Sequence, residues 1–249
     1  MTDLTALIIA AGRGIRMGPR GEYTPKGLLN VGGSALVQRS VQLLHERGIR
    51  AVRIVTGHLS EQYEAMFKDV EGVELVHNPD FATTGSLRSL VIGLFSMPRQ
   101  LELLESDLIY ERAALEAVGA DKSRIVVSGE TAAGDEVYIW TRQTSDGKPV
   151  FDMMSKDVTA RPQDHFGELT GISIFTSKDM VSLKNAAQAR FAADPKSDYE
   201  SAVVLMAQTC EIDCHLIPDL AWTEIDDETM LARATKVVWP EIQNRDTLG

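Results

Sequence analysis

Three cationic side chains, Arg13, Arg16 and Lys26, lie near the start of the chain in a stretch that is otherwise rich in small residues. Such a stretch lets a ligand lie directly on the main chain, whose N–H groups can point at phosphate oxygens. The small residues are Ala10, Ala11, Gly12 and Gly14. We predict that this loop binds a nucleoside triphosphate and that Arg13 and Lys26 contact the phosphates. The alternative is a glycine-rich turn with solvated arginines.

The spacing of the glycines separates this loop from two better-known phosphate loops. The pattern G-x-x-x-x-G-K-[ST] does not occur in the chain, and the glycines at 12, 14 and 18 read G-x-G-x-x-x-G. That spacing is one residue off the dinucleotide fingerprint, which argues against a dinucleotide-dependent oxidoreductase. The stretch instead reads A-A-G-x-G-x-R-M followed by P-K, which resembles the signature of sugar-nucleotide-type nucleotidyltransferases.

Two aspartates, Asp107 and Asp226, are the candidate metal ligands. Asp107 follows an apolar run at 101–105, and Asp226 lies far away in sequence. Burying a carboxylate is costly unless it is paired or bound to metal, and Mg²⁺ takes one or two carboxylates together with substrate phosphate oxygens. Each aspartate could instead cap a helix, one starting near residue 109 and one at 227. The acids alone do not decide, but the phosphate loop favours a metal site.

The elements that must position these residues alternate along the first half of the chain. Apolar strands are predicted at 4–10, 51–56 and 73–77, with helices at 34–47 and 60–68 between them, the first capped by Ser34. This alternation predicts an α/β fold with βαβ units, parallel strands and right-handed crossovers. We expect one domain over residues 1–249, with a nucleotide-binding half at 1–130.

The second half, residues 131–240, changes character and is predicted to bind the acceptor. A hairpin is expected from strands at 136–141 and 149–154 joined by S-D-G-K, and a further strand at 169–176. We interpret this half as a small β-rich lobe built on the same sheet. The tail at 243–249 has no apolar pattern and is expected to be loose.

A loop at 78–86 is the candidate base-binding segment. In a doubly wound sheet it would lie beside the first loop, at the carboxyl ends of the strands where ligands bind. Its hydroxyls and bare amides could face a base edge, and the candidates are Thr83, Thr84, Gly85 and Ser86. Thr84 or Ser86 could instead cap the helix after the loop, and the two roles are compatible.

The bulk composition excludes several classes of protein. The chain has 249 residues and a net charge of −11, which argues against a nucleic-acid-binding surface. No membrane-spanning run and no signal peptide are recognised, and two cysteines, Cys210 and Cys214, suit a reducing compartment, so we expect a cytoplasmic protein. The five histidines are scattered, and no Ser/His/Asp or Cys/His nucleophile set is convincing.

Later motifs carry a narrower resemblance. These are S-D-L-I-Y-E at 106–111, G-D-E-V-Y at 134–138, M-S-K-D at 154–157, D-Y-E at 198–200 and W-T-E-I-D-D at 222–227. With the N-terminal signature they make the chain similar to the cytidylyltransferases of phosphonate and phosphocholine metabolism, over nearly its whole length. The loop at 19–24 has no clear counterpart in that pattern.

The resemblance implies a Rossmann-like nucleotidyltransferase fold with a mainly parallel mixed sheet flanked by helices. It further implies that Asp107 and Asp226 bind Mg²⁺, that Lys26 contacts phosphate and that residues 83–86 read cytosine. The substrates would then be CTP and a small phosphonate such as 2-aminoethylphosphonate. A phosphonate oxygen is already anionic at pH 7, so the reaction needs positioning and charge neutralisation and no strong general base.

The tail of the acceptor is the remaining question. A primary ammonium offers three donors and calls for carboxylates, whereas a quaternary ammonium calls for aromatic faces. Lys156 is the candidate for the phosphonate, and the candidate acids are Asp135, Glu136, Glu168 and Glu200. The candidate aromatic residues are Tyr138, Trp140, Tyr199 and Trp222. Asp157 and Asp198 also lie in or beside these motifs, so acids outnumber aromatic residues in this half, which favours the primary amine.

Two rival functions stay open at this point. The nearest is the same chemistry on phosphocholine or another phosphorylated acceptor. The other is a non-catalytic nucleotide-sensing module, against which the presence of Lys26, Asp107 and Asp226 counts. The sequence does not determine the oligomeric state, and a homodimer is among the assemblies it allows.

Overall fold

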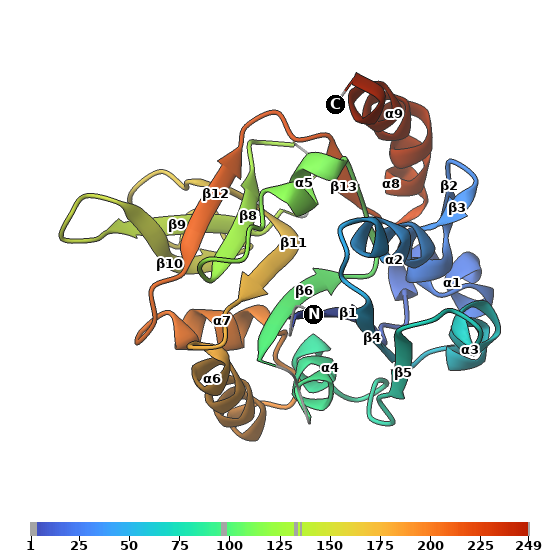
Figure 1. Cartoon of the computed structure of the whole chain (residues 1–249), viewed down its shortest axis with the longest axis horizontal. Coiled ribbons are helices and arrows are strands. Elements are labelled where there is room, and N and C mark those ends of the chain that lie inside the picture. The colour runs from blue at the N-terminus through green and yellow to red at the C-terminus, as the bar shows by residue number, and fades with distance from the viewer. Residues whose placement is uncertain (1–3, 96–98, 132–133, 135, 249) are drawn as a thin grey trace.

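The apolar run near the N-terminus forms a central strand, β1 (Leu4–Ala10), of a nine-stranded sheet (Figure 1). The computed structural model describes residues 4–95, 99–131, 134 and 136–248. The side chains of β1 alternate between two cores, because Leu7 and Ile9 face one side of the sheet while Ala6 and Ile8 face the other. A strand buried on both faces reads as a continuous apolar run, as the sequence does here.

The strand order is β5-β4-β1-β6-β11-β8-β12-β10-β9. Their bounds in that order are Val73–His77, Ala51–Thr56, Leu4–Ala10, Gln100–Glu105, Gly167–Phe175, Arg124–Ser128, Asp213–Ile217, Pro149–Ser155 and Tyr138–Gln143. The strands β5, β4, β1 and β6 are parallel, as are β8 and β12. The other pairings are antiparallel. The expected parallel arrangement therefore holds for β5, β4, β1 and β6, and the pairings of β11, β10 and β9 are antiparallel.

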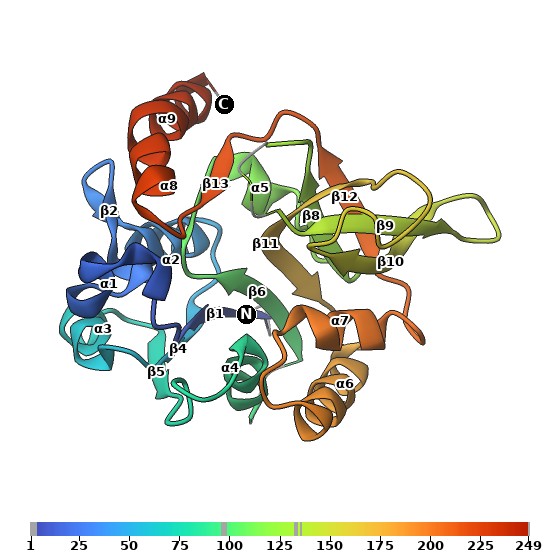
Figure 2. The ribbon, with the colours of Figure 1, turned by 180° about the vertical axis from the view of Figure 1, so that it is seen from behind.

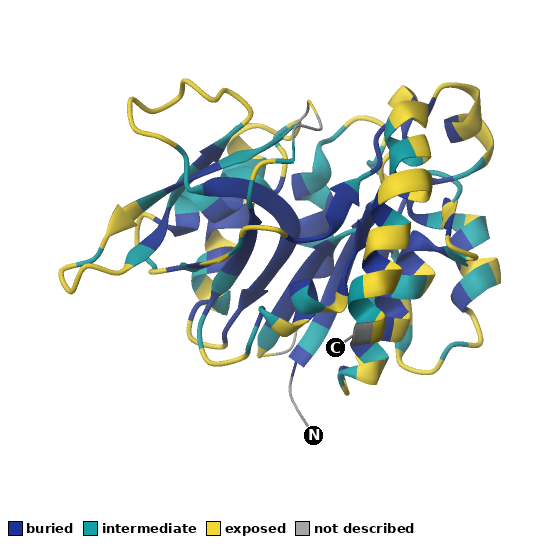
Figure 3. Ribbon diagram, turned by 90° about the horizontal axis from the view of Figure 1, so that it is seen from above, coloured by how far each residue is buried: buried dark blue, intermediate teal, exposed yellow. Residues whose placement is uncertain are grey.

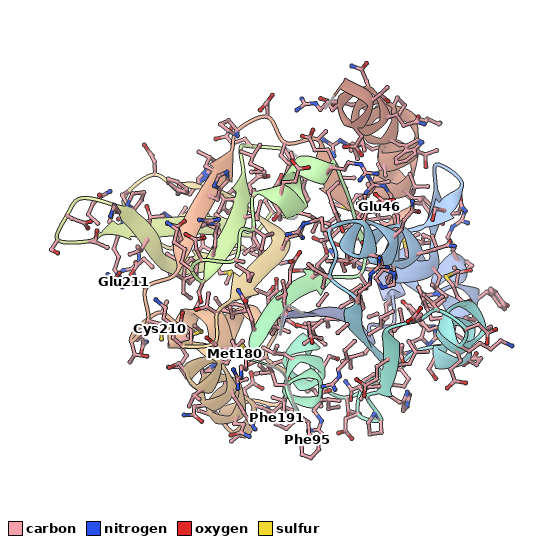
Figure 4. All side chains as sticks on the ribbon, viewed as in Figure 1. Glu46, Phe95, Met180, Phe191, Cys210 and Glu211 are labelled. Atoms are coloured by element: carbon pink, nitrogen blue, oxygen red, sulfur yellow. The ribbon has the colours of Figure 1, made fainter. Side chains whose placement is uncertain are left out.

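Helices cover both faces of the sheet (Figures 2 and 3). One face carries α2 (Leu36–Glu46), α3 (Ser60–Phe67) and α5 (Arg112–Glu116), whose apolar side chains share a core. The other face carries α4 (Ser86–Gly93), α6 (Met180–Ala193) and α7 (Glu200–Met206). Met180 and Phe191, labelled in Figure 4, pack against this second core from α6. The result is the layered α/β architecture expected from the sequence.

A third core joins the N-terminal loop to the end of the chain. It unites Met17, Leu29, Ile225, Val238 and Ile242 with several neighbours. The short elements around it are the 3₁₀ turns Ile15–Met17 and Lys26–Leu28, α1 (Pro19–Tyr23), β2 (Asn30–Val31), β3 (Ser34–Ala35), α8 (Glu228–Arg233), the π-helix Ala234–Val238 and α9 (Trp239–Leu248). Met17 and Ile225 of this core are adjacent in sequence to Arg16 and Asp226, and Leu29 lies three residues after Lys26.

Two local expectations are wrong. Residues 243–248 are not loose, because they form the end of α9, where Asp246 pairs with Arg39 at 3.0 Å (Oδ2 to Nη2). Ser34 does not cap a helix, since it lies in β3 and α2 begins at Leu36. The predicted hairpin is present as β9 and β10, with Gly147 at a positive φ of 80° in its turn. Within the described residues, every helix is too short or too polar to cross a bilayer.

Candidate active site

The phosphate loop leaves β1 at Ala10 and turns at Gly14, whose φ of 60° and ψ of 36° place it in the left-handed region that glycine adopts most easily. A Cβ at this position would also lie 3.2 Å from Cγ of Lys26. The next 3₁₀ turn ends at Met17, which is buried in the third core. Met17 of the signature therefore holds the turn against the third core. Gly14 leaves room for the aliphatic part of the Lys26 side chain.

Asp107 and Asp226 are brought together by a two-stranded ladder of β7 (Leu108–Tyr110) and β13 (Trp222–Glu224). The ladder continues through a bond in which the Ile225 N–H donates to the Asp107 carbonyl at 2.9 Å. Residue 109 lies in this strand, so the alternative that Asp107 caps a helix there is wrong. It is Asp227, not Asp226, that caps α8, accepting a bond from the Met230 N–H at 2.8 Å.

Lys26 lies between the two aspartates. Its Nζ is 2.9 Å from Asp107 Oδ2 and also contacts Asp226 Oδ1, while Nη2 of Arg16 is 2.7 Å from Asp226 Oδ2. The Asp226 side chain is 1% exposed and that of Lys26 is 17% exposed. Burial lowers the pKa of Lys26, but the charges of Asp107 and Asp226 outweigh it and raise that pKa above its usual value. The ammonium is therefore held in its charged form.

These groups line a pocket of about 250 Å³ together with Ala10, Gly12 and Gly14, and we call it the phosphate pocket. Arg13 does not line it, because this exposed side chain lies on the neighbouring pocket with Ala11. Arg16, and not Arg13, lies beside the carboxylates and lines the phosphate pocket. The sequence marked Arg16 as a cation near the loop but did not indicate a role for it.

The candidate base pocket, of about 350 Å³, adjoins the phosphate pocket and includes Gly12, Thr84, Gly85 and Ser86. The hydroxyls of Thr83 and Thr84 both donate to the Asp80 carbonyl. Thr83 does not line the base pocket. Neither Thr84 nor Ser86 caps α4. The N-cap residue is Gly85, and no side chain makes a capping hydrogen bond from that position. The Ser86 hydroxyl donates to Asp198 Oδ1 at 3.0 Å instead.

A third pocket, of about 70 Å³, opens beside the phosphate pocket and is lined by acids; we call it the acid pocket. The predicted acceptor residues Glu136, Lys156, Glu168 and Glu200 all line it. The carboxylate of Glu168 accepts bonds from the Thr131 N–H and hydroxyl at 3.0 and 2.7 Å, so it also holds the loop beside it. Asp135 lies outside the described residues.

Two further glutamates, Glu105 and Glu224, line both the acid pocket and the phosphate pocket. One carboxylate oxygen from each of Glu105, Asp107 and Glu224 lies within 4.8 Å of the other two. We did not predict Glu105 or Glu224, although each stands two residues before a predicted metal ligand. In an extended segment that spacing places both side chains on one face, which is the signal that could have found them.

Burial raises the pKa values of three carboxyl groups around these pockets. Burial first, and then the charges of Glu200 and Asp107, raises the pKa of Glu105. The pKa of Glu224 rises through burial and then through Asp107 and Glu105, and that of Glu200 rises chiefly through burial. The Tyr199 hydroxyl donates to Glu105 Oε1 at 2.6 Å. Crowded, partly desolvated carboxyls of this kind would be stabilised by a cationic ligand.

The aromatic candidates do not assemble around the acid pocket. Trp222 lines it, but Trp140 is fully buried and its indole N–H donates to the Gln163 carbonyl at 3.0 Å. Tyr138 stacks near His165, with ring centroids 4.8 Å apart, and Tyr199 is engaged with Glu105. Among the described lining residues, the acid pocket therefore offers one aromatic face and several carboxylates.

Curated relatives align with this chain over different spans. A protein named CMP-5'-(3-aminopropyl)phosphonate synthase from Streptomyces rubellomurinus is 28% identical over 89% of this chain and 37% of its own length. A choline-phosphate cytidylyltransferase from Streptococcus pneumoniae is 37% identical over 36% of this chain and 38% of its own length. A 2-aminoethylphosphonate cytidylyltransferase from Lancefieldella rimae is 29% identical over 42% of this chain and 43% of its own length. The chain thus spans less than half the length of these relatives.

Solved structures share the fold. The CTP:phosphocholine cytidylyltransferase of Streptococcus pneumoniae superposes with a TM-score of 0.74 at 19% identity, covering 94% of this chain and 99% of that one. The inositol-1-phosphate CTP transferase of T. maritima gives 0.79 at 16% identity, covering 96% of each chain. A model of the MobA-like NTP transferase domain matches residues 6–227, which contain the phosphate loop and both aspartates. The chain therefore belongs to the MobA-like NTP transferase family.

Proposed function

We propose that this protein transfers CMP from CTP to a small phosphonate, with 2-aminoethylphosphonate as its preferred acceptor, and releases pyrophosphate. The observation that carries the proposal is the junction of two pockets, one with Arg16 and Lys26 beside the small-residue loop and the other lined by further carboxylates. A triphosphate suits the first and an acceptor with a cationic tail suits the second. The names of the curated relatives support CMP transfer to acceptors of this type.

The proposed reaction forms one P–O bond and breaks another. A phosphonate oxygen attacks the α-phosphorus of CTP, the bond from that phosphorus to its bridging oxygen breaks, and the electron pair leaves on pyrophosphate. The nucleophile is already an anion, so this chain's task is to orient two anions and to offset their charge. Lys26 and Arg16 supply cations, the amides of residues 10–14 receive phosphate oxygens, and Lys156 at the junction orients the phosphonate.

Mg²⁺ is the proposed cofactor, held by the carboxylates of Asp107 and Asp226. Their oxygen atoms are the donors that Mg²⁺ prefers, and the ammonium between them indicates that the pair accommodates a cation. Glu105 and Glu224 stand next to Asp107 and add to the negative field. When bound, Mg²⁺ would supply positive charge against the triphosphate and its leaving group.

The acceptor choice rests on the acid pocket. A primary ammonium can donate three hydrogen bonds, and Glu136, Glu168 and Glu200 are the proposed acceptors. A phosphocholine headgroup has no N–H to donate and would rely on the face of Trp222. The presence of that indole keeps phosphocholine as the second candidate. A non-catalytic sensor is disfavoured because Lys26, Asp107 and Asp226 meet in one place.

We place this reaction in the cytoplasm, where CTP is made. A homodimer stays a prediction, which size-exclusion chromatography with light scattering can test. The decisive experiment is a pyrophosphate-release screen of CTP, UTP, ATP and GTP against phosphonates and phosphate esters with Mg²⁺. We expect CTP with 2-aminoethylphosphonate to give the highest rate. Preference for phosphocholine would select the second candidate, and nucleotide binding without pyrophosphate from any pair would indicate a sensor.

A further inference from the structure

The carboxylate pair of the phosphate pocket already holds a cation that belongs to the chain. Lys26 Nζ contacts one oxygen of each aspartate, at 2.9 Å from Asp107 Oδ2 and within bonding reach of Asp226 Oδ1. Arg16 Nη2 lies 2.7 Å from the second oxygen of Asp226. Asp226 is almost completely buried, at 1% exposure, so it needs such a partner in the absence of any ligand. Lys26 and Arg16 thus do in this structure what a metal ion would otherwise do.

A lysine ammonium and a divalent cation cannot share these oxygen atoms. Both need the same lone pairs on Asp107 and Asp226, and two like charges at contact distance repel strongly in a partly buried site. Lys26 is 17% exposed, and the pocket that contains it also contains the phosphate loop. Its four-carbon stem is flexible, so the ammonium can turn from the aspartates to a phosphate within the same pocket. Arg16 can remain on Oδ2 of Asp226, the oxygen that Lys26 does not contact, during that exchange.

We propose that Lys26 is the resident counter-ion of the Asp107–Asp226 pair, and that a divalent cation enters as a nucleoside triphosphate draws Lys26 away. The inference rests on the proposed function for the identity of the nucleotide. It predicts that metal and nucleotide favour each other's binding, because each helps to remove Lys26 from the aspartates. The chain alone should therefore bind the metal weakly.

The test measures Mn²⁺ binding to the whole chain without nucleotide, by the electron paramagnetic resonance of free Mn²⁺. If Lys26 occupies the pair more than about nine-tenths of the time, its removal should tighten Mn²⁺ binding about tenfold or more. The first variant is Lys26→Gln, whose amide can still donate to the carboxylates and protect the fold. Lys26→Met is the second, and circular dichroism checks both. Lys26→Arg keeps the charge and should bind Mn²⁺ as weakly as the wild type.

Matched controls locate the effect. Arg20 pairs with Glu228 on the surface, at 2.5 Å between Nε and Oε1, with both side chains about half exposed. Arg20→Gln should leave Mn²⁺ binding unchanged. Adding Asp226→Asn to Lys26→Gln should abolish the gain. Equal Mn²⁺ affinity in the wild type and in folded Lys26→Gln or Lys26→Met would overturn the inference. A tenfold gain in a chain that releases no pyrophosphate would keep the inference and reject the proposed function.

Discussion

The phosphate pocket and the acid pocket lie side by side and share Glu105, Lys156, Glu200 and Glu224, yet they are built differently. The phosphate pocket relies on main chain and on cations that are paired with carboxylates, such as Lys26 with Asp107 and Asp226. The acid pocket relies on carboxyl groups whose pKa values burial raises, such as those of Glu105 and Glu200. The phosphate pocket offers cations and main-chain amides to a phosphate, and the acid pocket gains stability when positive charge arrives.

We expect this difference to separate the recognition of the two proposed substrates. A triphosphate in the acid pocket would meet five carboxylates, with Lys156 as the one cation among the described lining residues, whereas the phosphate pocket adds Lys26, Arg16 and main-chain amides. Like charges in contact cost free energy and so act against binding in the wrong pocket. Substitutions that change one pocket and leave the other intact can therefore separate the two contributions.

The largest effect is expected from the carboxylate pair. Asp107→Asn and Asp226→Asn should each lower turnover by at least about two orders of magnitude, because each removes an anionic ligand of the proposed Mg²⁺. Turnover is measured at saturating CTP, acceptor and Mg²⁺. Both substitutions are nearly isosteric, so we expect folded proteins.

Asp227 provides the control for that pair. It is adjacent to Asp226 but caps α8 through the Met230 N–H. Asparagine is an equally good cap, so Asp227→Asn should retain near-normal turnover. Near-normal turnover in Asp107→Asn or Asp226→Asn would remove that residue from the site.

The next effect concerns the cations of the phosphate pocket. Lys26→Ala should cost about 2–4 kcal/mol of transition-state stabilisation, as expected for one preorganised electrostatic contact. Arg13→Ala should be milder, because Arg13 lies on the base pocket. The measurement is kcat/KM for CTP, and an unchanged value in Lys26→Ala would mean that this lysine does not contact the nucleotide.

A smaller effect is expected from the acceptor. With CTP and Mg²⁺ held constant, 2-aminoethylphosphonate should exceed phosphocholine by at least about tenfold in kcat/KM, a gap of about 1.4 kcal/mol. The N-trimethyl derivative of 2-aminoethylphosphonate is the matched ligand, because it changes the ammonium and keeps the phosphonate. Equal rates for the two phosphonates would show that the carboxylates do not recognise the acceptor through hydrogen bonds from its N–H groups.

The smallest effect is expected in the core, away from both pockets. Glu102 is fully buried, and burial raises its pKa to about 7 despite its partner Arg47, whose Nη1 is 2.7 Å from Oε1. A carboxyl with a raised pKa binds its proton more tightly when folded, so its contribution to stability falls as the pH rises through that value. We expect a loss of about 1 kcal/mol in unfolding free energy between about pH 6 and pH 8.

Glu102→Gln tests that prediction, since glutamine cannot ionise. Urea unfolding of the wild type and the variant at both pH values gives the difference between their pH slopes. The carboxyls of the two pockets titrate in both proteins and cancel in that difference. Equal slopes would mean that Glu102 is already ionised in the folded protein throughout this range.

Much of the first half of the chain could be predicted from the sequence, because its signals are local. The apolar run of β1 indicates a buried strand, and the glycines after it indicate a loop. The choice between Arg13 and Arg16 could not be predicted, since it depends on the left-handed turn at Gly14 and on Met17 entering the third core. A cation's position in sequence does not fix the direction of its side chain.

The ladder that unites the aspartates was missed for a different reason. Its strands, β7 and β13, have three residues each, too few for a periodic pattern to appear. The helix at the end of the chain was missed because its stability comes from tertiary contacts. Ile242 is fully buried in the third core, and Asp246 bonds to the Arg112 N–H at 2.9 Å. Local apolar spacing does not reveal such partners.

Strand β11 has a consequence for how the chain acquires its structure. It is buried along its whole length and lies between β6 and β8, pairing Ser173 with Leu103 on one side and with Ile125 on the other. The neighbouring strands β1 and β4 can pair early, since the helix between them brings them together. β11 can pair only after distant parts of the chain have met, and such non-local pairing slows folding.

We therefore expect the insertion of β11 to limit the folding rate and to couple the two halves. The acid pocket includes Leu169 and Gly171 from this strand, so it should not exist before the strand is in place. Ile172 is fully buried in the middle of β11. The substitution Ile172→Ala should slow refolding and destabilise both halves together. A single unfolding transition, with coincident fluorescence and circular dichroism curves, would be its equilibrium signature.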